Sequence, residues 1–277
     1  LMYLTARVPN FAHATIATLA SYITLTVYLQ GLNPYLAAPL AFAFVGTLLL
    51  MLYWIVIRTL ISHGATIISL TIATLAIELM IYSCINIYAD NLTRIYKYFS
   101  RYFVLREADF TLMGLPGIFT VSITLTIAAV ISLHLLLTRT RFGIAMRATV
   151  EDPALATVLG VNTDLINAVS WFIAGGLCGL AGALFPLWFQ MSPMIGITLI
   201  ITVMAGSILG GLSSIYGSLL GGFVVGLTEI LLTGYLAEMI GPQIIAYKLL
   251  IPLFIMIIVL LFFPSGLIGF IERLRTR

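Results

Sequence analysis

The chain has 277 residues, of which 61% are hydrophobic and only 8% charged, with a formal net charge of +3 and a mean hydropathy of +1.15. A soluble domain is about 25% charged, so this composition excludes a water-soluble globular protein. The small, scattered positive excess argues against nucleic-acid binding. Continuous rather than alternating apolar runs argue against a membrane barrel. We therefore predict an all-α, multi-pass membrane protein with a single transmembrane domain over residues 1–277.

Apolar runs close to the roughly 20 residues of a membrane-spanning helix recur along the whole chain. They predict a bundle of about eight spans, at residues 11–30, 35–57, 65–88, 118–137, 165–187, 195–209, 219–233 and 244–263. The sixth and seventh runs are separated by a glycine-rich break. A re-entrant pair, buried in protein or lining a cavity, is therefore an alternative at residues 195–233.

Arginine and lysine set the predicted orientation. Residues 138–162 and the basic tail at 264–277 each carry three arginines and are expected on the cytoplasmic side. The long connection at residues 89–116, which is mixed and aromatic, then lies outside the cell. Long loops count less in the positive-inside rule, so its four basic residues do not reverse the bias.

Residues 138–162 form the longest polar interruption in the second half of the chain. Asp152 followed by Pro153 is typical of a helix N-cap with proline at the first helical position. The sequence PALATVLG therefore predicts a short helix of about two turns that stops at Gly160. A segment this short is no domain, so its exposed faces need another subunit as partner.

Catalytic motifs are missing from the sequence. It contains no HExxH or GxSxG, and Lys97 and Lys248 both follow tyrosine, which excludes the Gly-Lys pair of a phosphate-binding loop. Cys84 and Cys178 lie in predicted spans without metal-ligand spacing. We expect no enzymatic activity, no ATPase site, no cofactor and no metal site.

Two acids lie within predicted spans, Glu78 and Glu229. A carboxylate in hydrocarbon is costly and is a candidate functional group by default. The simpler interpretation is a neutral acid hydrogen-bonded between helices. Both interpretations stay open for each acid.

Small residues four apart let helix backbones approach closely in lipid. Such pairs occur at Gly175/Gly179, Gly206/Gly210, Gly217/Gly221 and Gly222/Gly226. They predict a tightly packed second half. The break from Gly210 and Gly211 to Gly217 is also a candidate for shaping a translocation path.

Several stretches together resemble the integral-membrane permeases of branched-chain amino acid ABC transporters, more closely the first of the two paralogous permeases. They are NFAHATIATLASYIT (residues 10–24), RFGIAMRATVEDPALATVLGVN (141–162), ILGGLSSIYGSLLGGFVVGLTE (208–229) and FFPSGLIG (262–269). In this family a hydrophobic helix precedes the first stretch, and here only residues 1–8 do. We therefore expect a truncated or misassigned start.

The resemblance implies a subunit of an ATP-driven importer in the cell membrane. Its partners would be cytosolic ATP-binding subunits, a second paralogous permease, an extracytoplasmic substrate-binding protein facing residues 89–116, and the lipid bilayer. Residues 138–162 would be the cytoplasmic coupling segment. Carried over position by position, the ATPase-coupling residues are Gly143, Arg147, Ala148, Glu151, Asp152, Ala156 and Gly160. The resemblance implies polar ATPase contacts for Arg147 and the acids, and close backbone approach at the alanines.

Two alternatives remain for the function. The same machine could carry urea, short amides or another small solute such as a sugar. A secondary transporter using Glu78 and Glu229 would instead work without an ATPase, and the two halves of the chain show no clear internal repeat. A structural subunit of a respiratory complex would need a line of buried charges, and only these two buried acids are present.

Overall fold

The computed structural model describes residues 1–6, 8–112, 114–212, 214–262 and 266. Most of the basic tail predicted to face the cytoplasm, and most of the stretch FFPSGLIG, fall outside these residues. The chain divides into two compact units, Leu1–Gly196 (unit 1) and Ile197–Arg277 (unit 2). Whether they act as the single transmembrane domain predicted above stays a prediction.

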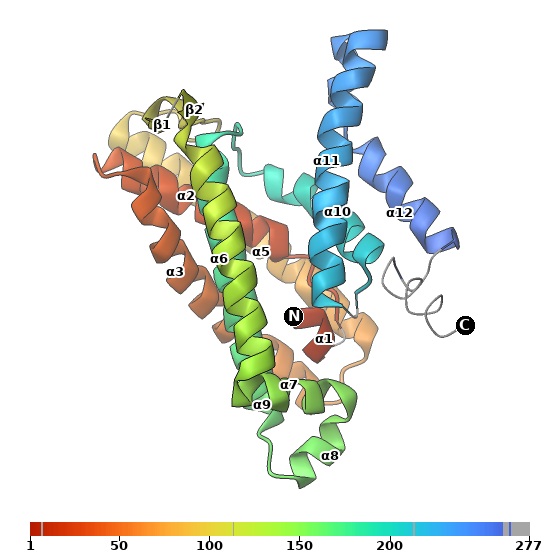
Figure 1. The fold of residues 1–277 in the computed structure, drawn as a ribbon. Helices are drawn as coiled ribbons and strands as arrows, with labels where there is room; N and C mark the ends of the chain where they lie inside the picture. The colour runs from red at the N-terminus through yellow and green to blue at the C-terminus, as the bar shows by residue number, and fades with distance from the viewer. Residues whose placement is uncertain (7, 113, 213, 263–265, 267–277) are drawn as a thin grey trace. The chain divides into compact units, whose positions relative to one another are not determined.

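Unit 1 is built from helices with one small hairpin (Figure 1). Its helices are α1 (Met2–Ala6), α2 (His13–Leu29), α3 (Ala37–Leu52), α4 (Arg58–Ser62), α5 (Ile67–Tyr96), α6 (Gly117–Arg139), α7 (Arg141–Glu151), α8 (Pro153–Val158) and α9 (Thr163–Leu184). Short 3-10 turns lie at Pro34–Leu36, Arg106–Ala108 and Phe185–Leu187, and a π-helical segment at Tyr53–Ile57 joins α3 to α4. The antiparallel strands β1 (Thr111–Leu112) and β2 (Leu115–Pro116) pair Leu112 with Leu115.

Unit 2 contains most of α10 (Ile195–Gly210), then α11 (Ile215–Ile240), a 3-10 helix at Pro242–Tyr247, and α12 (Leu250–Phe262). Four of its buried apolar residues, Ala205, Leu209, Val225 and Val259, form one small cluster. α10 and α11 are separate helices, and α11 alone is long enough to cross a membrane.

The core of unit 1 is organised around α9, which packs most extensively against α3 and then α2. Glycines line the contacting face of α9, so neighbouring backbones come within van der Waals distance of it. Hydroxyl groups of α2 reinforce the contact, since Ser21 donates to the carbonyl of Gly182 at 2.7 Å and Thr24 to that of Ala183 at 2.8 Å. Trp171, Tyr22 and Tyr53 are the largest fully buried side chains.

The predicted helical membrane fold is confirmed. Five helical stretches are long and apolar enough to cross a membrane, at Pro34–Ser62, Ile67–Tyr96, Gly117–Arg139, Thr163–Leu187 and Ile215–Ile240, and three shorter apolar helices occupy the remaining predicted spans. Every predicted span contains a helix.

Several predicted boundaries were wrong, among them the start of the seventh span, expected at residue 219, since α11 begins at Ile215. The connection expected to begin at residue 89 begins only after Tyr96, because α5 continues through a polar stretch. α11 likewise continues to Ile240, through the loop expected after residue 233. The last span was expected from residue 244, but Gly241 and Pro242 start a 3-10 helix, and α12 begins only at Leu250.

Candidate functional site

The corner between α6 and α7 is held by close backbone contact at the start of the coupling segment (residues 138–162). A β-carbon at Gly143 would lie 2.0 Å from the carbonyl oxygen of Leu137, so only glycine fits. The Arg147 guanidinium donates a hydrogen bond to that same oxygen. Thr140 caps α7 by accepting a hydrogen bond from the Gly143 amide at 3.3 Å. One carbonyl at the end of α6 therefore meets two of the predicted coupling residues.

α8 begins and ends as the sequence predicts. The Asp152 carboxylate accepts hydrogen bonds from the amides of Ala154 and Leu155 at 2.9 and 3.0 Å, which satisfies the free donors of the first turn. Gly160 has φ +85°, a conformation that favours glycine and ends the helix. Ala156 is buried within the chain, so its small size already serves internal packing.

The coupling segment exposes an apolar stripe that the sequence analysis did not single out. Leu155, Val158 and Leu159 are 55%, 84% and 73% exposed, and their spacing places them on one side of α8. Ile144 on α7 is 61% exposed. The signal was present in the sequence, since these three residues of PALATVLG follow helical spacing. Glu151 and Asp152 are also exposed, and Ala148 is half-buried.

The far end of the coupling segment is tied back to unit 1. Asn162 caps α9 by accepting the Leu165 amide at 3.0 Å. The guanidinium of Arg58 on α4 donates two hydrogen bonds, of 2.8 and 2.9 Å, to the Asp164 carboxylate, and it also lies over the Trp54 ring. In Figure 1, α7 and α8 lie at one end of unit 1 and the β1–β2 hairpin at the opposite end, as their predicted placement on opposite sides of the membrane requires.

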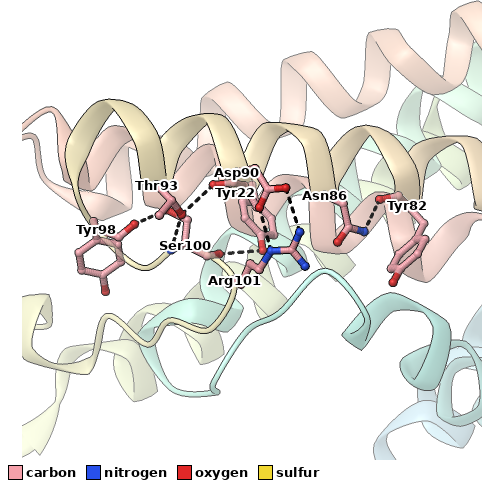
Figure 2. A network of polar contacts seen from close by, with 9 residues as sticks. Tyr22, Tyr82, Asn86, Asp90, Thr93, Tyr98, Ser100 and Arg101 are labelled. Carbon is pink, nitrogen blue, oxygen red and sulfur yellow. Dashed lines mark hydrogen bonds and ion pairs between the residues drawn. The ribbon is translucent and has the colours of Figure 1, made fainter.

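The α5–α6 connection (residues 97–116) is anchored by polar contacts to the last turns of α5. Figure 2 shows Arg101 lying beside Asp90, with nitrogen–oxygen distances of 2.8 and 2.9 Å. Hydrogen bonding to Asp90, and then its charge, raises the pKa of the Arg101 guanidinium above its ordinary value. The neighbouring Ser100 amide donates to Thr93, and the Ser100 carbonyl accepts from the Tyr22 hydroxyl of α2 at 3.0 Å.

The rest of this connection is fixed to the segment that follows α9. Phe103 and Met191 exchange backbone hydrogen bonds of 3.1 and 2.8 Å, and the Leu105 amide donates to the Pro186 carbonyl. Asp109 accepts from the Tyr35 hydroxyl at 2.6 Å and from the amide of Ile118 at the start of α6. The connection is therefore an ordered cap on one end of unit 1.

The glycine pairs differ in how closely a neighbouring helix approaches them. Gly175 and Gly179 face α3, where a β-carbon at Gly179 would lie 2.4 Å from the Ala41 carbonyl oxygen. In unit 2, Gly206 and Gly210 of α10 face Gly217 and Gly221 of α11 with similarly short approaches. These short approaches agree with close packing at the three pairs, and the role of these glycines stays a prediction. Added β-carbons at Gly222 and Gly226 would meet no heavy atom of the described residues within 4 Å outside the local helix, although the Gly222 backbone itself lies nearest to a β-carbon placed at Gly206, at 2.8 Å.

A family model described as "Branched-chain amino acid transport system / permease component" matches residues 1–260. The chain belongs to this permease family. It is 40% identical to the probable branched-chain amino acid transport permease protein LivH of Methanocaldococcus jannaschii over 270 residues, 97% of this chain and 85% of that protein. It is an integral, multi-pass membrane protein. No solved structure matches the permease significantly.

Two other relatives align with part of the permease. The high-affinity branched-chain amino acid transport system permease protein LivH of Escherichia coli is 32% identical over 145 residues, 52% of this chain and 45% of that protein. The fructose import permease protein FrcC of Rhizobium meliloti is 33% identical over 117 residues, 40% of this chain and 32% of that protein.

The two span acids of the permease each meet a threonine on a neighbouring helix. The Thr15 hydroxyl of α2 donates to Glu78 at 3.4 Å, and that of Thr202 on α10 donates to Glu229 at 3.0 Å. These contacts favour the hydrogen-bonded interpretation of both acids. Within the described ranges, no group of three or more His, Cys, Asp or Glu residues is arranged to hold a metal ion.

Proposed function

We propose that this chain is the membrane-spanning permease subunit of an ATP-driven importer of branched-chain amino acids. The observation that carries the proposal is the 40% identity to the M. jannaschii protein along 97% of the chain. The sequence has no phosphate-binding loop, so separate cytosolic ATP-binding subunits would supply the energy. The fructose permease aligns with only 40% of the chain, which favours amino acids over sugars as cargo.

The coupling segment is the proposed docking site for the ATP-binding subunits. Its apolar stripe of Leu155, Val158 and Leu159 would enter a cleft on the ATPase, because a contiguous exposed apolar patch on a water-facing segment is typical of a protein interface. Glu151 and Asp152 would make polar contacts beside the stripe. Gly143 and Arg147 would act by fixing the corner between α6 and α7. When the ATPase moves α8, α6 and α7 would then move together as one rigid body.

The remaining partners follow from the same assembly. A second, paralogous permease would complete the translocation path, and an extracytoplasmic substrate-binding protein would dock on the α5–α6 connection. An ordered docking surface loses little conformational freedom when it binds, and the hydrogen-bonded cap at residues 97–116 has this property. Lipid would contact most of α6, of whose most apolar stretch only 6% is buried.

The test uses two charge substitutions on α8. Val158→Asp places a carboxylate in the exposed stripe, whereas Thr157→Asp adds the same charge at an exposed position on the opposite side of the same helix. Each variant is co-expressed with the ATP-binding subunits and the second permease. Co-elution and leucine-stimulated ATP hydrolysis, with binding protein present, are then measured.

Because an unpaired charge buried in an interface is costly, Val158→Asp is expected to reduce co-elution more than about tenfold, while Thr157→Asp stays close to wild type. Equal behaviour of the two variants would remove α8 from the interface. Leucine uptake into liposomes by the chain alone, without ATP, would instead support a secondary transporter and make Glu78 and Glu229 the residues to test.

A further inference from the structure

Unit 2 contains an apolar groove that the transport assembly described above does not use. It lies between α11 and α12, has a volume of about 400 Å³, and is also lined by Ile244 and Tyr247 of the 3-10 helix Pro242–Tyr247. Leu232 and Leu236 of α11 face Ile251 and Phe254 of α12 across it. Leu232 and Phe254 remain 39% and 63% exposed, so the groove is open to its surroundings.

Two polar groups lie at different positions along this groove. Lys248 lines it next to the 3-10 helix and is exposed, and in the part of the chain that the structure describes its ammonium makes no ion pair. Thr233 also lines the groove, and its hydroxyl is buried without a hydrogen-bond partner among the described residues. Seven residues separate Thr233 from the end of α11 at Ile240, a depth of about 10 Å at 1.5 Å per residue.

An occupant must match a cation at one end of the groove, a hydroxyl donor further along it, and apolar walls beside both. An apolar helix of another subunit would match the apolar walls, but it would offer no partner to the Lys248 ammonium or the Thr233 hydroxyl. An amino acid would place its carboxylate on Lys248 but its ammonium beside walls that contain no carboxylate. An anionic phospholipid satisfies all three features, since its phosphate, glycerol oxygens and acyl chain follow one another in the same order.

We propose that the groove between α11 and α12 is a binding site for an anionic phospholipid. The phosphate pairs with the Lys248 ammonium, the Thr233 hydroxyl donates to a glycerol-linked oxygen, and one acyl chain lies against Leu232, Ile251 and Phe254. The site would hold a structural lipid on unit 2. This inference stands on the groove alone and does not depend on the cargo or on ATP coupling.

The test measures lipid retention by the full-length chain in detergent, by native mass spectrometry. Phosphatidylglycerol and phosphatidylcholine with identical acyl chains are added in equal amounts. Wild type is expected to retain phosphatidylglycerol about fivefold more than phosphatidylcholine, the preference that one lysine near an anionic headgroup provides. Lys248→Gln should abolish that preference. Lys97→Gln, which removes an exposed charge in unit 1, should leave it unchanged.

A second variant tests the groove itself. Ile251→Trp fills the space between the helices and should reduce retention of both lipids, whereas Thr233→Val should weaken retention of both while keeping the preference for phosphatidylglycerol. Equal retention of the two lipids by wild type, or an unchanged preference in Lys248→Gln, overturns the proposal. Displacement of the lipid by inorganic phosphate would show a free-anion site and overturn it as well.

Discussion

α9 and α11 carry the same spacing of small residues, yet they use it to different extents. Half of the most apolar stretch of α9 is buried, compared with 17% for α11. Gly175, Gly179 and Gly182 of α9 all meet the backbone of another helix, whereas Gly226 and Gly234 of α11 meet nothing within 4 Å among the described residues. Glycine spacing therefore permits close packing without requiring it. Substituting single glycines of the two helices, and comparing the resulting loss of stability, should show where close packing occurs.

The largest effect is expected at Gly182. A β-carbon there would lie 2.1 Å from the carbonyl oxygen of Ala17, and a backbone atom cannot move aside as a side chain can. Gly182→Val should destabilise unit 1 by at least about 3 kcal/mol, the upper range for overpacking. The measurement is the temperature at which a thiol-reactive dye labels the buried Cys178, in a chain whose exposed thiol is removed by Cys84→Ser.

The matched control for this substitution is Ala181→Val, which changes an exposed neighbour on the same helix. It should leave the labelling temperature of Cys178 nearly unchanged. If Gly182→Val labels at the same temperature as the control, α2 and α9 are not in backbone contact.

A smaller loss is expected in unit 2. A β-carbon at Gly221 would lie 2.2 Å from the Gly206 carbonyl oxygen, but the buried cluster around it is much smaller than that of unit 1. Gly221→Val should cost about 2 kcal/mol. A thiol introduced by Val225→Cys, at a fully buried position, reports the opening of unit 2 after both native cysteines are removed. Gly222→Val is the control, and a loss equal to that of Gly221→Val would contradict the observed helix face.

Hydrogen bonds between α2 and α9 should contribute less than the glycine contacts. Ser21→Ala removes the hydroxyl that donates to the Gly182 carbonyl, and an interhelical bond in a membrane protein averages about 0.6 kcal/mol. The expected result is a slight fall in the Cys178 labelling temperature. Ser83→Ala, which removes a hydroxyl that bonds to the carbonyl of Leu79 in its own helix, should produce no comparable fall. A change as large as that of Gly182→Val would mean that hydroxyl bonds, rather than close packing, hold α9 in place.

Hydropathy predicted a run that contains a helix in all eight cases, because burial in lipid requires apolar side chains all around a helix. It missed the end of α5, because that helix continues through a polar stretch, and the end of α11, because that helix continues past Gly234, where a loop was expected. α7 was missed for a related reason, since its sequence RFGIAMRATVE mixes charged and apolar residues around a glycine. The role of that glycine depends on the carbonyl of Leu137, a tertiary contact that spacing alone does not reveal.

In the candidate site, local rules succeeded where the interactions were local. Asp152 caps the start of α8 and Gly160 follows its end, as predicted, because helix caps depend on residues within one or two turns. The Arg147 bond to Leu137 spans ten residues and a change of helix direction, so residue spacing alone does not predict it. The assignment of Arg147 as an ATPase contact remains a prediction, and the geometry adds a second role in holding the α6–α7 corner.

The smallest expected effect lies at Gly226, where the contrast between α9 and α11 predicts a change of opposite sign. A β-carbon there meets no heavy atom of the described residues within 4 Å, and alanine favours a helix over glycine by up to about 1 kcal/mol. Gly226→Ala should therefore raise the labelling temperature of the Val225→Cys reporter slightly. Labelling at a lower temperature than the parent would mean that Gly226 is packed after all. If the isolated chain is stabilised but Gly226→Leu blocks co-purification with the second permease, this face of α11 is glycine-rich because another subunit packs against it.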